Sequence, residues 1–308
     1  MGRQVAFVTY KEHPEITDDD SLAANALEQL GIEAVGIAWD EAGVDWTRFD
    51  AVVLRSCWDY FHHPRRFFSW IDSLKDQGVN LLNDHATVRW NAEKTYLADL
   101  RTAGVTIVPT VYAEQYSNAS IREILNEQGW ERAAVKPTIS GTSLHTWVSG
   151  PIDAVSSLRD DQKKLDSLLR ERSMMLQEYL PEIETTGELS LIYFGGEYSH
   201  AVRKVPRMGD FRVQDDFGGT WNAVEPNEII KAQADAVLRA SGRASVGTSA
   251  RTSVYARVDG VQRGETFLLM ELEMIEPHLF LAAHPAAAER FAQAVTSRVS
   301  NHAAASRP

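Results

Sequence analysis

Residues Val254–Pro277 read VYARVDGVQRGETFLLMELEMIEP, and this stretch decides the fold. Its second half is predicted to be a β-strand, in which successive side chains point to opposite faces. One face is then wholly apolar and consists of Leu268, Met270, Leu272 and Met274. The opposite face carries the two carboxylates of Glu271 and Glu273, beside the apolar Phe267, Leu269 and Ile275.

An earlier strand is predicted to end at Asp259, and residues 260–266 are predicted to turn the chain back. Such a hairpin brings Asp259 towards Glu271 and Glu273. Burying carboxylates is costly unless a cation neutralises them, and three hard oxygen ligands suit Mg²⁺. The pattern therefore indicates either a magnesium site or a solvated strand face with ordinary surface glutamates.

The composition is that of a globular protein without a nucleic-acid or membrane partner. The chain has 308 residues, enough for two or three subdomains. Its net charge of -12 argues against nucleic-acid binding, which needs a basic face. Cys57 is the single cysteine, which excludes an internal disulfide and is typical of a cytoplasmic location. The N-terminus is predicted to be a strand and not a signal peptide, and no apolar run is long enough to span a bilayer.

The N-terminal region alternates between strands and helices. Strands are predicted at 4–9, 33–39, 51–55 and 80–83, and helices at 21–30 and 67–77. This alternation favours a small parallel α/β unit. Ligands of such sheets bind beyond the carboxyl ends of the strands.

Two loops of this unit are therefore candidates for a small-molecule pocket. Tyr10 and Asp18 follow the first strand, and the run RSCWDY, residues 55–60, follows the third. In this interpretation Arg55 binds a carboxylate while Trp58 and Tyr60 form the walls. The alternative is that both aromatics belong to the core and that Arg55 pairs with Asp59.

Two further features of these loops have structural interpretations. The acidic run at residues 18–20 favours the dipole of the helix that it opens. Cys57 has no histidine near it in the sequence, and free cysteines are mostly buried and inert, so it is not expected to be a nucleophile.

The middle of the chain contains two lysines and a loop of small residues that are candidates for binding phosphate. A helix is predicted over 87–103 and carries Lys94, and a strand over 133–136 ends in Lys136. The loop TISGTS, residues 138–143, follows and is of a type that wraps phosphate. It is not a Walker loop, because the Gly-Lys-Ser/Thr sequence is missing.

The region after residue 170 contains a basic hairpin. A strand over 174–177 leads into QEYLP, and residues 188–204 are predicted to form a hairpin around Gly195-Gly196. Lys204, Arg207 and Arg212 would form a phosphate clamp facing the acidic hairpin. A helix is predicted over 228–240, a mobile loop over 241–253 and a terminal helix over 286–299.

The order of these motifs resembles the ATP-grasp superfamily, in its glutathione-synthetase branch. QEYLP resembles the adenine hinge of that branch, and MELEMIEP resembles its metal strand. The resemblance implies an α/β fold with an α+β lid and three subdomains. These are a Rossmann-like pre-ATP-grasp substrate domain at 1–85, a linker helix and lid at 86–175, and a nucleotide- and metal-binding domain at 176–308.

A narrower resemblance covers almost the whole chain. The runs RSCWDY at 55–60, RWN at 89–91, SHAVRK at 199–204, GDFRVQ at 209–214 and YARVD at 255–259 are similar to the subgroup that contains the cycloserine-forming O-ureido-D-serine cyclo-ligase. The loop after Lys136 has only Gly141 where the family is commonly richer in glycine. Glu273 stands where many relatives carry Asn.

The resemblance implies a role for each matching position. The residues implied in ATP binding are Lys94, Lys136, Ser140, Gly141, Thr142, Gln177, Glu178, Tyr179, Leu180 and, for the ribose, Glu188 or alternatively Glu184. Those implied in holding the γ-phosphate and acyl phosphate are Lys204 and Arg212. The implied Mg²⁺ ligands are Asp259, Glu271 and Glu273. The candidate substrate residues are Tyr10, Asp18, Arg55, Ser56, Trp58 and Tyr60.

The implied chemistry is phosphoryl transfer followed by acyl transfer. A small amino-acid-like substrate is activated at its carboxylate to an acyl phosphate, and a nitrogen nucleophile then displaces phosphate. The alternatives are ring closure within one molecule, as in cycloserine formation, and a nucleotide-binding module without catalysis. A dinucleotide-dependent oxidoreductase is disfavoured, because no Gly-x-Gly-x-x-Gly follows the first strand. A homodimer is one possible assembly.

Overall fold

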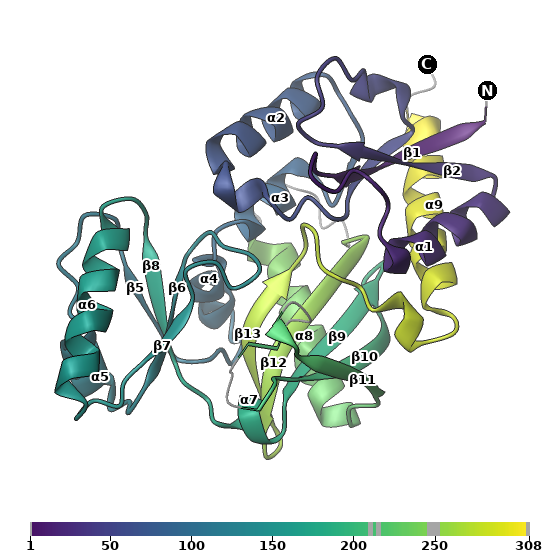
Figure 1. Ribbon diagram of the computed structural model, residues 1–308. Coiled ribbons are helices and arrows are strands. Elements are labelled where there is room, and N and C mark those ends of the chain that lie inside the picture. The colour runs from purple at the N-terminus through teal and green to yellow at the C-terminus, as the bar shows by residue number, and fades with distance from the viewer. Residues whose placement is uncertain (1, 209–211, 214–216, 245–252, 306–308) are drawn as a thin grey trace.

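The computed structural model describes residues 2–208, 212–213, 217–244 and 253–305, and these form three sheets (Figure 1). Most of the GDFRVQ motif and of the predicted loop over 241–253 lies outside the described residues. None of the helices in the described ranges is long and apolar enough to cross a membrane.

The first sheet is parallel, in the order β2-β1-β3-β4, which confirms the predicted α/β unit. Its strands are β1 (Arg3–Thr9), β2 (Ile32–Ala38), β3 (Ala51–Leu54) and β4 (Leu81–Leu82). Alternate residues of β1 face opposite helix layers, as the two-residue period of a strand requires. Val5 and Phe7 pack towards α1 (Asp18–Gln29) and the C-terminal helix α9 (Ala287–Ala305), whereas Ala6 and Val8 pack towards α2 (Pro64–Asp76).

The predicted single helix over 87–103 is wrong. The chain forms α3 (His85–Asn91) and α4 (Tyr96–Thr102) and breaks between them. The break is stabilised by a contact with the loop after β6, because the backbone N–H of Lys94 donates to Thr138 O at 2.8 Å. This tertiary contact, which the helical pattern of the sequence does not reveal, turns Lys94 towards the lid.

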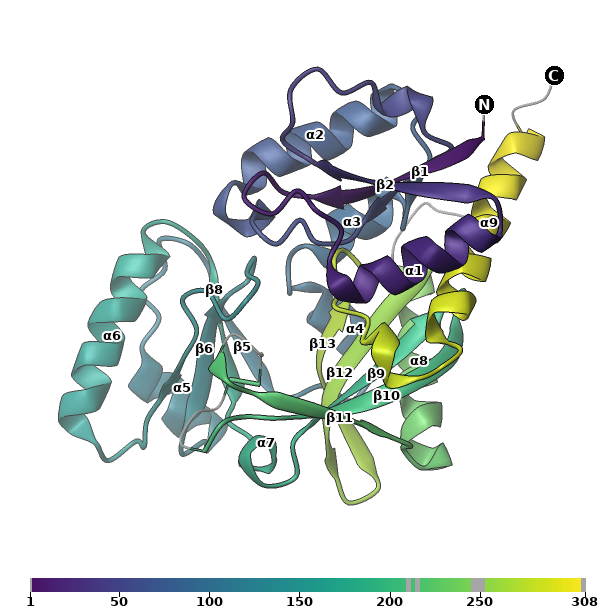
Figure 2. The ribbon, with the colours of Figure 1, turned by 45° about the vertical axis from the view of Figure 1, so that its right-hand side comes forward.

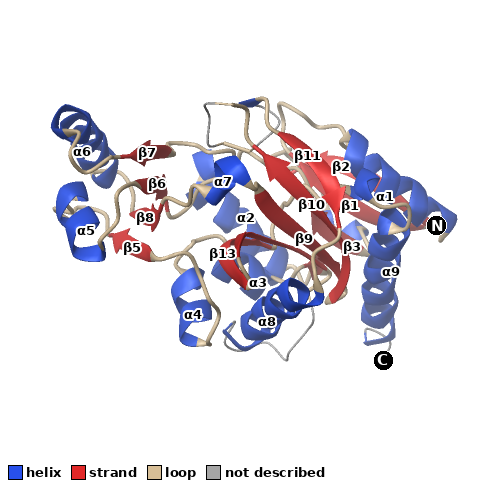
Figure 3. Cartoon of the chain, turned by 90° about the horizontal axis from the view of Figure 1, so that it is seen from below, coloured by secondary structure: helices blue, strands red, loops and turns tan. Residues whose placement is uncertain are grey.

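The second sheet is antiparallel, in the order β5-β8-β6-β7. Its strands are β5 (Thr110–Ala113), β8 (Met174–Glu178), β6 (Ala133–Pro137) and β7 (Trp147–Ser149), with α5 (Ile121–Gln128) and α6 (Val155–Leu169) on its outer face (Figure 1). Seen from below, this sheet and its helices stand to one side of the large sheet (Figure 3). Because β8 pairs within this sheet, we propose that the last domain begins after Glu178 and not at 176.

The third sheet has the order β11-β10-β9-β12-β13. Its strands are β9 (Glu188–Phe194), β10 (Glu197–Val205), β11 (Thr220–Val224), β12 (Tyr255–Arg263) and β13 (Thr266–Glu273). The accompanying helices are α7 (Glu182–Thr185) and α8 (Glu228–Ala244). Short 3₁₀ turns lie at 46–48, 60–62 and 281–283.

The predicted hairpin is confirmed, but its predicted faces are not. Asp259 lies opposite Glu271, and the register then shifts so that Gly260 lies opposite Leu269. Met270 is therefore the extra residue of a β-bulge, which reverses the alternation along the strand. Leu272 and Met274 consequently share one core with Phe267 and Leu269, whereas Leu268 and Met270 belong to another.

Gly260 is required at this bulge. A Cβ there would lie 2.5 Å from Leu268 O and 2.6 Å from the Phe267 ring, closer than real Cβ contacts allow. The turn itself lies further on, at Gly264, between the end of β12 and the start of β13.

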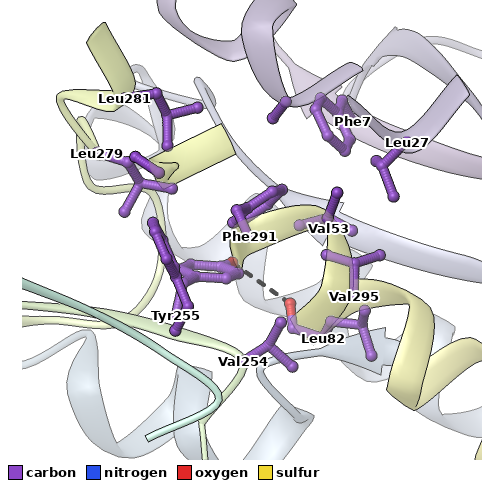
Figure 4. Packing of buried hydrophobic residues seen from close by; sticks show 14 of the residues in the cluster. Phe7, Leu27, Val53, Leu82, Val254, Tyr255, Leu279, Leu281, Phe291 and Val295 are labelled. Carbon is purple, nitrogen blue, oxygen red and sulfur yellow. Dashed lines mark hydrogen bonds between the residues drawn. The ribbon is translucent and has the colours of Figure 1, made fainter. Parts of the chain in front are cut away.

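The C-terminal helix ties the third sheet to the first. Phe291 and Val295 of α9 pack with Phe7 and Val53 of the first sheet and with Tyr255 of β12 (Figure 4). α1 and α9 lie side by side (Figure 2). The substrate domain predicted at 1–85 is thereby fixed against the domain that carries the acidic hairpin.

Candidate active site

One cavity of about 560 Å³ collects side chains from all three sheets. Most of the residues predicted from the sequence line it: Asp18, Trp58, Tyr60, Lys94, Lys136, Ser140, Gly141, Thr142, Gln177, Glu178, Tyr179, Leu180, Glu188, Lys204, Arg212, Asp259, Glu271 and Glu273. Four predicted residues are not among its lining: Tyr10, Arg55, Ser56 and Glu184.

Arg257 lies at the centre of the acidic hairpin. Its Nε lies 3.0 Å from both carboxylate oxygens of Asp259, and its Nη2 lies 2.5 Å from Glu273 Oε1. Burial disfavours the guanidinium charge, but Asp259 and Glu273 outweigh this and raise the pKa of Arg257. No role of Arg257 was predicted from the sequence. The hairpin register, which sets it opposite Glu273, was the signal that could have identified it.

Glu271 pairs with the two lysines predicted to contact ATP. Its carboxylate lies 2.9 Å from Lys94 Nζ and 3.7 Å from Lys136 Nζ. Burial opposes ionisation of Glu271, but these two ammonium groups lower its pKa overall. Burial also lowers the pKa of Lys136.

A second ion-pair group lies on the neighbouring strands β9 and β10. Lys204 Nζ lies 2.5 Å from Glu188 Oε1 and 3.7 Å from Asp259 Oδ1, and Ser190 Oγ donates to Asp259 at 2.5 Å. Burial raises the pKa of Glu188. The pKa of Asp259 is lowered in spite of its burial, because Arg257 and Lys204 are close.

The carboxylates of the hairpin suit a hard divalent cation in their chemistry. Burial, with Glu271 and Asp259 nearby, raises the pKa of Glu273 to about 7 even beside Arg257. A bound cation would relieve this repulsion. In the described ranges, no three His, Cys, Asp or Glu side chains gather as a ligand set. Each predicted ligand is instead paired with Lys or Arg.

The loop after β6 closes against the first domain. Lys94 Nζ donates to Ser140 O at 2.7 Å, and a Cβ on Gly141 would lie 2.4 Å from the Phe61 ring. Thr142 and Ser143 have φ values of 44° and 57°, in the left-handed region that non-glycine residues rarely adopt. Strain of this kind is held by surrounding contacts and is often found at ligand-binding loops.

The hinge after β8 uses two of its backbone N–H groups within the protein. The N–H of Glu178 donates to Pro109 O at 3.0 Å, and the N–H of Tyr179 donates to Arg132 O at 3.1 Å. Gln177 is buried and donates to Thr110 Oγ1 at 3.2 Å. The adenine contacts that the resemblance implies for this hinge stay a prediction.

The two candidates for the ribose differ in position. Glu188 lines the cavity, whereas Glu184 is outside it and accepts a hydrogen bond from the Tyr179 hydroxyl. This placement favours Glu188, although its carboxylate is paired with Lys204.

The structure does not bring Arg55 to the cavity. Arg55 is fully buried, and its Nε and Nη2 lie 2.9 and 2.8 Å from Asp20 Oδ1. Its Nη2 also donates to Pro277 O at 3.0 Å. The alternative partner, Asp59, instead accepts from Trp39 Nε1 at 2.7 Å. The expected substrate clamp is thus corrected to a buried structural ion pair.

Ser56 and Tyr10 are not among the residues that line the cavity. Ser56 is buried, and the ring of Tyr10 packs against His13. Trp58 and Tyr60 do line the cavity, and Trp58 Nε1 donates to Glu276 O at 3.0 Å.

Asp19 was not predicted for the site, but it lines the cavity together with Asp18. Asp18 is exposed, whereas Asp19 Oδ1 accepts from Ala282 N–H at 3.3 Å and its Oδ2 lies 3.4 Å from His278 Nε2. That Oδ2 is buried and, among the residues that the structure describes, accepts no hydrogen bond of normal geometry. Burial opposes ionisation of Asp19, but His278 and two backbone amides lower its pKa overall.

Arg212 also lines the cavity, with its guanidinium carbon 3.7 Å from the centroid of the Phe217 ring. Phe280 and Trp221, which were not predicted, also line the cavity, with ring centroids 5.3 Å apart. Phe280 adopts φ 50°, and its carbonyl accepts from His200 at 3.0 Å.

Comparisons with known proteins agree on one relative. The family model of the N-terminal domain of D-cycloserine synthetase DcsG matches residues 5–83. The cycloserine biosynthesis protein DcsG of Streptomyces lavendulae is 31% identical over 290 residues, which cover 89% of this chain and 91% of that protein.

Solved structures extend the similarity to the fold. The crystal structure of D-cycloserine synthetase DcsG matches with a TM-score of 0.86 and 30% identity, over 96% of this chain and 99% of that one. A D-alanine–D-alanine ligase from Bacillus anthracis, complexed with ATP, matches with a TM-score of 0.67 and 14% identity, over 99% of this chain and 100% of that one. At that identity the second match supports the fold alone.

Proposed function

We propose a substrate and a product for this chain, which belongs to the DcsG family of ATP-grasp ligases and is an ATP-dependent enzyme of the C–N ligase type. The substrate is a small amino acid of the O-ureidoserine class, activated at its carboxylate. A nitrogen of the same molecule then closes a ring of the cycloserine type. The observation that carries this proposal is a cavity in which phosphate-binding cations and carboxylates meet a substrate wall of aromatic and acidic residues.

The phosphoryl-transfer half of the site is built on the hairpin and the lysines around it. Asp259, Glu271 and Glu273 would hold Mg²⁺, which neutralises phosphate charge when bound. Lys94 and Lys136 would bind phosphate oxygens as point charges. Both lysines are paired with Glu271, so binding of Mg-ATP would exchange these ion pairs for contacts to phosphate and metal.

The acyl-transfer half depends on Arg257, Lys204 and Arg212. Arg257 presents a guanidinium group in the cavity, suited to the negative charge that develops on the carbonyl oxygen and the leaving phosphate. Lys204 and Arg212 add cationic charge on the same side. The chain needs no covalent nucleophile, because positioning and charge neutralisation supply the catalysis.

We assign the substrate ammonium group to Asp19. Its Oδ1 is fixed by Ala282 N–H, and its buried Oδ2, which lies 3.4 Å from His278 Nε2, would accept from the ammonium group. Trp58, Tyr60 and Phe280 enclose the small substrate. Ring closure is favoured over joining two molecules because an internal nitrogen gains effective concentration without a second binding site.

The proposal is tested by measuring ADP release with Mg-ATP in the presence of the D- and L-enantiomers of amino acids and of O-ureidoserine. We expect ADP release above background with one enantiomer of O-ureidoserine, together with an equal amount of a cyclic product detected by mass spectrometry. ADP release that requires two different amino acids would show joining of two molecules instead. ATP binding without ADP release under any acid would indicate a nucleotide-binding module.

Two further proposals concern the whole protein. A cytoplasmic location, which gives access to ATP, suits this chemistry, and the product class would place the enzyme in antibiotic biosynthesis. A homodimer remains a prediction, which light scattering after size-exclusion chromatography tests.

A further inference from the structure

We propose that the carboxylate of Glu276 accepts the proton of the attacking nitrogen in the acyl-transfer step. This inference rests on the proposed function, because it assumes an acyl phosphate. Glu276 was not among the residues predicted for the site. It follows β13 by three residues and lines the cavity.

The first support is the difference between Glu276 and the four cavity carboxylates on strands β9, β12 and β13. Asp259, Glu271, Glu273 and Glu188 each form an ion pair with Lys or Arg. Glu276 forms none within the described part of the chain. A carboxylate without a cationic partner is free to take up a proton, whereas one paired with a fixed cation resists it.

The second support is the way in which its backbone is held. Five successive carbonyls from Met274 to His278 each accept a hydrogen bond from a side chain. The donors are Asn83, Tyr255, Trp58, Arg55 and Arg257, in that order, at 2.8 to 3.0 Å. These hydrogen bonds fix the backbone position from which the side chain of Glu276 extends. A proton acceptor requires such a fixed position.

The third support is its place between the two halves of the site. Glu276 stands three residues beyond Glu273, a proposed metal ligand, and its backbone carbonyl contacts Trp58 of the substrate wall. The acyl carbon must lie between the phosphate side and the substrate side. A proton acceptor for the attacking nitrogen is needed at that junction.

The electrostatic surroundings agree with this role. Burial, followed by repulsion from Glu273, raises the pKa of Glu276 to about 8, in spite of Lys94 and its own backbone N–H. A base near the working pH is the effective one. The titratable and charged groups that act on Glu276, or on which it acts, are Glu271, Glu273, Lys94, Cys57, Tyr60 and Tyr255.

The step balances without another reagent. The nitrogen lone pair forms the C–N bond at the acyl carbon, and the C–O bond to phosphate breaks with its electron pair leaving on phosphate. The N–H proton passes to Glu276 and from there to solvent.

The test separates the two half-reactions with hydroxylamine. This nucleophile is unprotonated at neutral pH, so it captures an acyl phosphate as a hydroxamate without help from a base. Wild type and Glu276→Gln are compared with Mg-ATP, O-ureidoserine and hydroxylamine. The matched control is Glu289→Gln, the same change at an exposed position on α9. Formation of hydroxamate or ring product by the wild type tests the proposed function separately from the role of Glu276, because it does not depend on the variant.

We expect Glu276→Gln to lose about 10²- to 10⁴-fold in ring formation, the usual range for a general base. ADP release and hydroxamate formation with hydroxylamine should stay within about 3-fold of the wild type, and Glu276→Asp should restore part of the ring formation. The rise of ring formation with pH through about pH 8 should disappear in Glu276→Gln. Equal loss of hydroxamate and ring product, or loss of neither, would overturn the assignment.

Discussion

Two arginines of this chain are both buried and paired with an aspartate, but they differ in whether they line the cavity. Arg55 ends a strand of the first domain and pairs with Asp20, and Arg257 lies on β12 and pairs with Asp259 and Glu273. Arg55 is sealed between helix and sheet, with no contact to the cavity. Arg257 has one side on the cavity. Burial and pairing alone therefore do not identify a functional arginine; access to a ligand does.

The two arginines also cooperate. Arg55 donates to Pro277 O and Arg257 to His278 O, so both fix the segment that follows the acidic hairpin. Arg55 reaches this segment from outside the cavity lining, whereas Arg257 both holds the segment and lines the cavity. Substitutions of the two arginines test this distinction, and substitutions of Glu271 and Lys136 test the groups proposed to bind Mg²⁺ and ATP.

The largest effect is expected on the stability of Arg55→Met. Removing one partner leaves Asp20 charged and buried, which costs about 3–5 kcal/mol of unfolding free energy. The double variant Arg55→Met/Asp20→Leu should recover most of this loss, because neither charge remains. Urea unfolding measures it, with the exposed Arg66→Met as the control.

The same variant also tests the corrected role of Arg55. In folded Arg55→Met, the KM for the acid should stay within about 3-fold of the wild type. A selective and large rise in that KM, with unchanged stability, would return Arg55 to the substrate pocket.

Arg257→Lys should show the opposite pattern. The charge remains, so we expect little change in unfolding free energy. The planar guanidinium group, which donates to Asp259 and Glu273 at once, is lost, so product formation should fall by about 10²- to 10³-fold. Steady-state kinetics beside urea unfolding measures both. A stability loss without a kinetic loss would make Arg257 a second structural arginine.

Glu271→Gln removes one of the anionic ligands proposed for Mg²⁺. ADP formation should fall by at least about 10²-fold, and the Mg²⁺ concentration needed for half-maximal rate should rise. Glu265→Gln, in the exposed turn of the same hairpin, is the control. Near-normal turnover at low Mg²⁺ in the folded variant would refute the metal assignment.

Lys136→Ala is expected to have the smallest effect. Losing one point charge on phosphate should weaken ATP binding by about 10-fold, because Lys94 remains beside Glu271. Calorimetry with a non-hydrolysable ATP analogue measures this, and the exposed Lys163→Ala is the control. Unchanged ATP affinity and kinetics would leave Lys136 with a structural role.

The hairpin of the site and its three carboxylates could be predicted from the sequence, but the β-bulge in the hairpin and the helix break at Lys94 could not. The hairpin and its three carboxylates follow from alternation and a turn, which are local properties. The bulge at Met270 does not follow, because it is set by the close packing of Gly260 against Leu268 and Phe267. The break at Lys94 likewise depends on Thr138, 44 positions away in the chain (138 minus 94).

Residue roles were hardest to predict for polar side chains that have several possible hydrogen-bond or ion-pair partners. Nothing in the RSCWDY run shows that Arg55 reaches back to Asp20 and across to Pro277. Asp18 and Asp19 are equivalent in the sequence, and only the helix start and Ala282 distinguish them. Glu276 lies within the stretch Val254–Pro277, but the sequence does not show which carboxylates of that stretch pair with Lys or Arg. Only the structure shows that, within the described part of the chain, Glu276 forms no such ion pair.

The central claim is that ATP activates the substrate carboxylate in this cavity. The most direct measurement follows ¹⁸O from an O-ureidoserine labelled at both carboxylate oxygens. If an acyl phosphate forms, one ¹⁸O leaves with the phosphate for each product molecule, and mass spectrometry should find singly labelled phosphate equal to the ADP released. Release of ADP with unlabelled phosphate would show attack by water on ATP and would contradict the account.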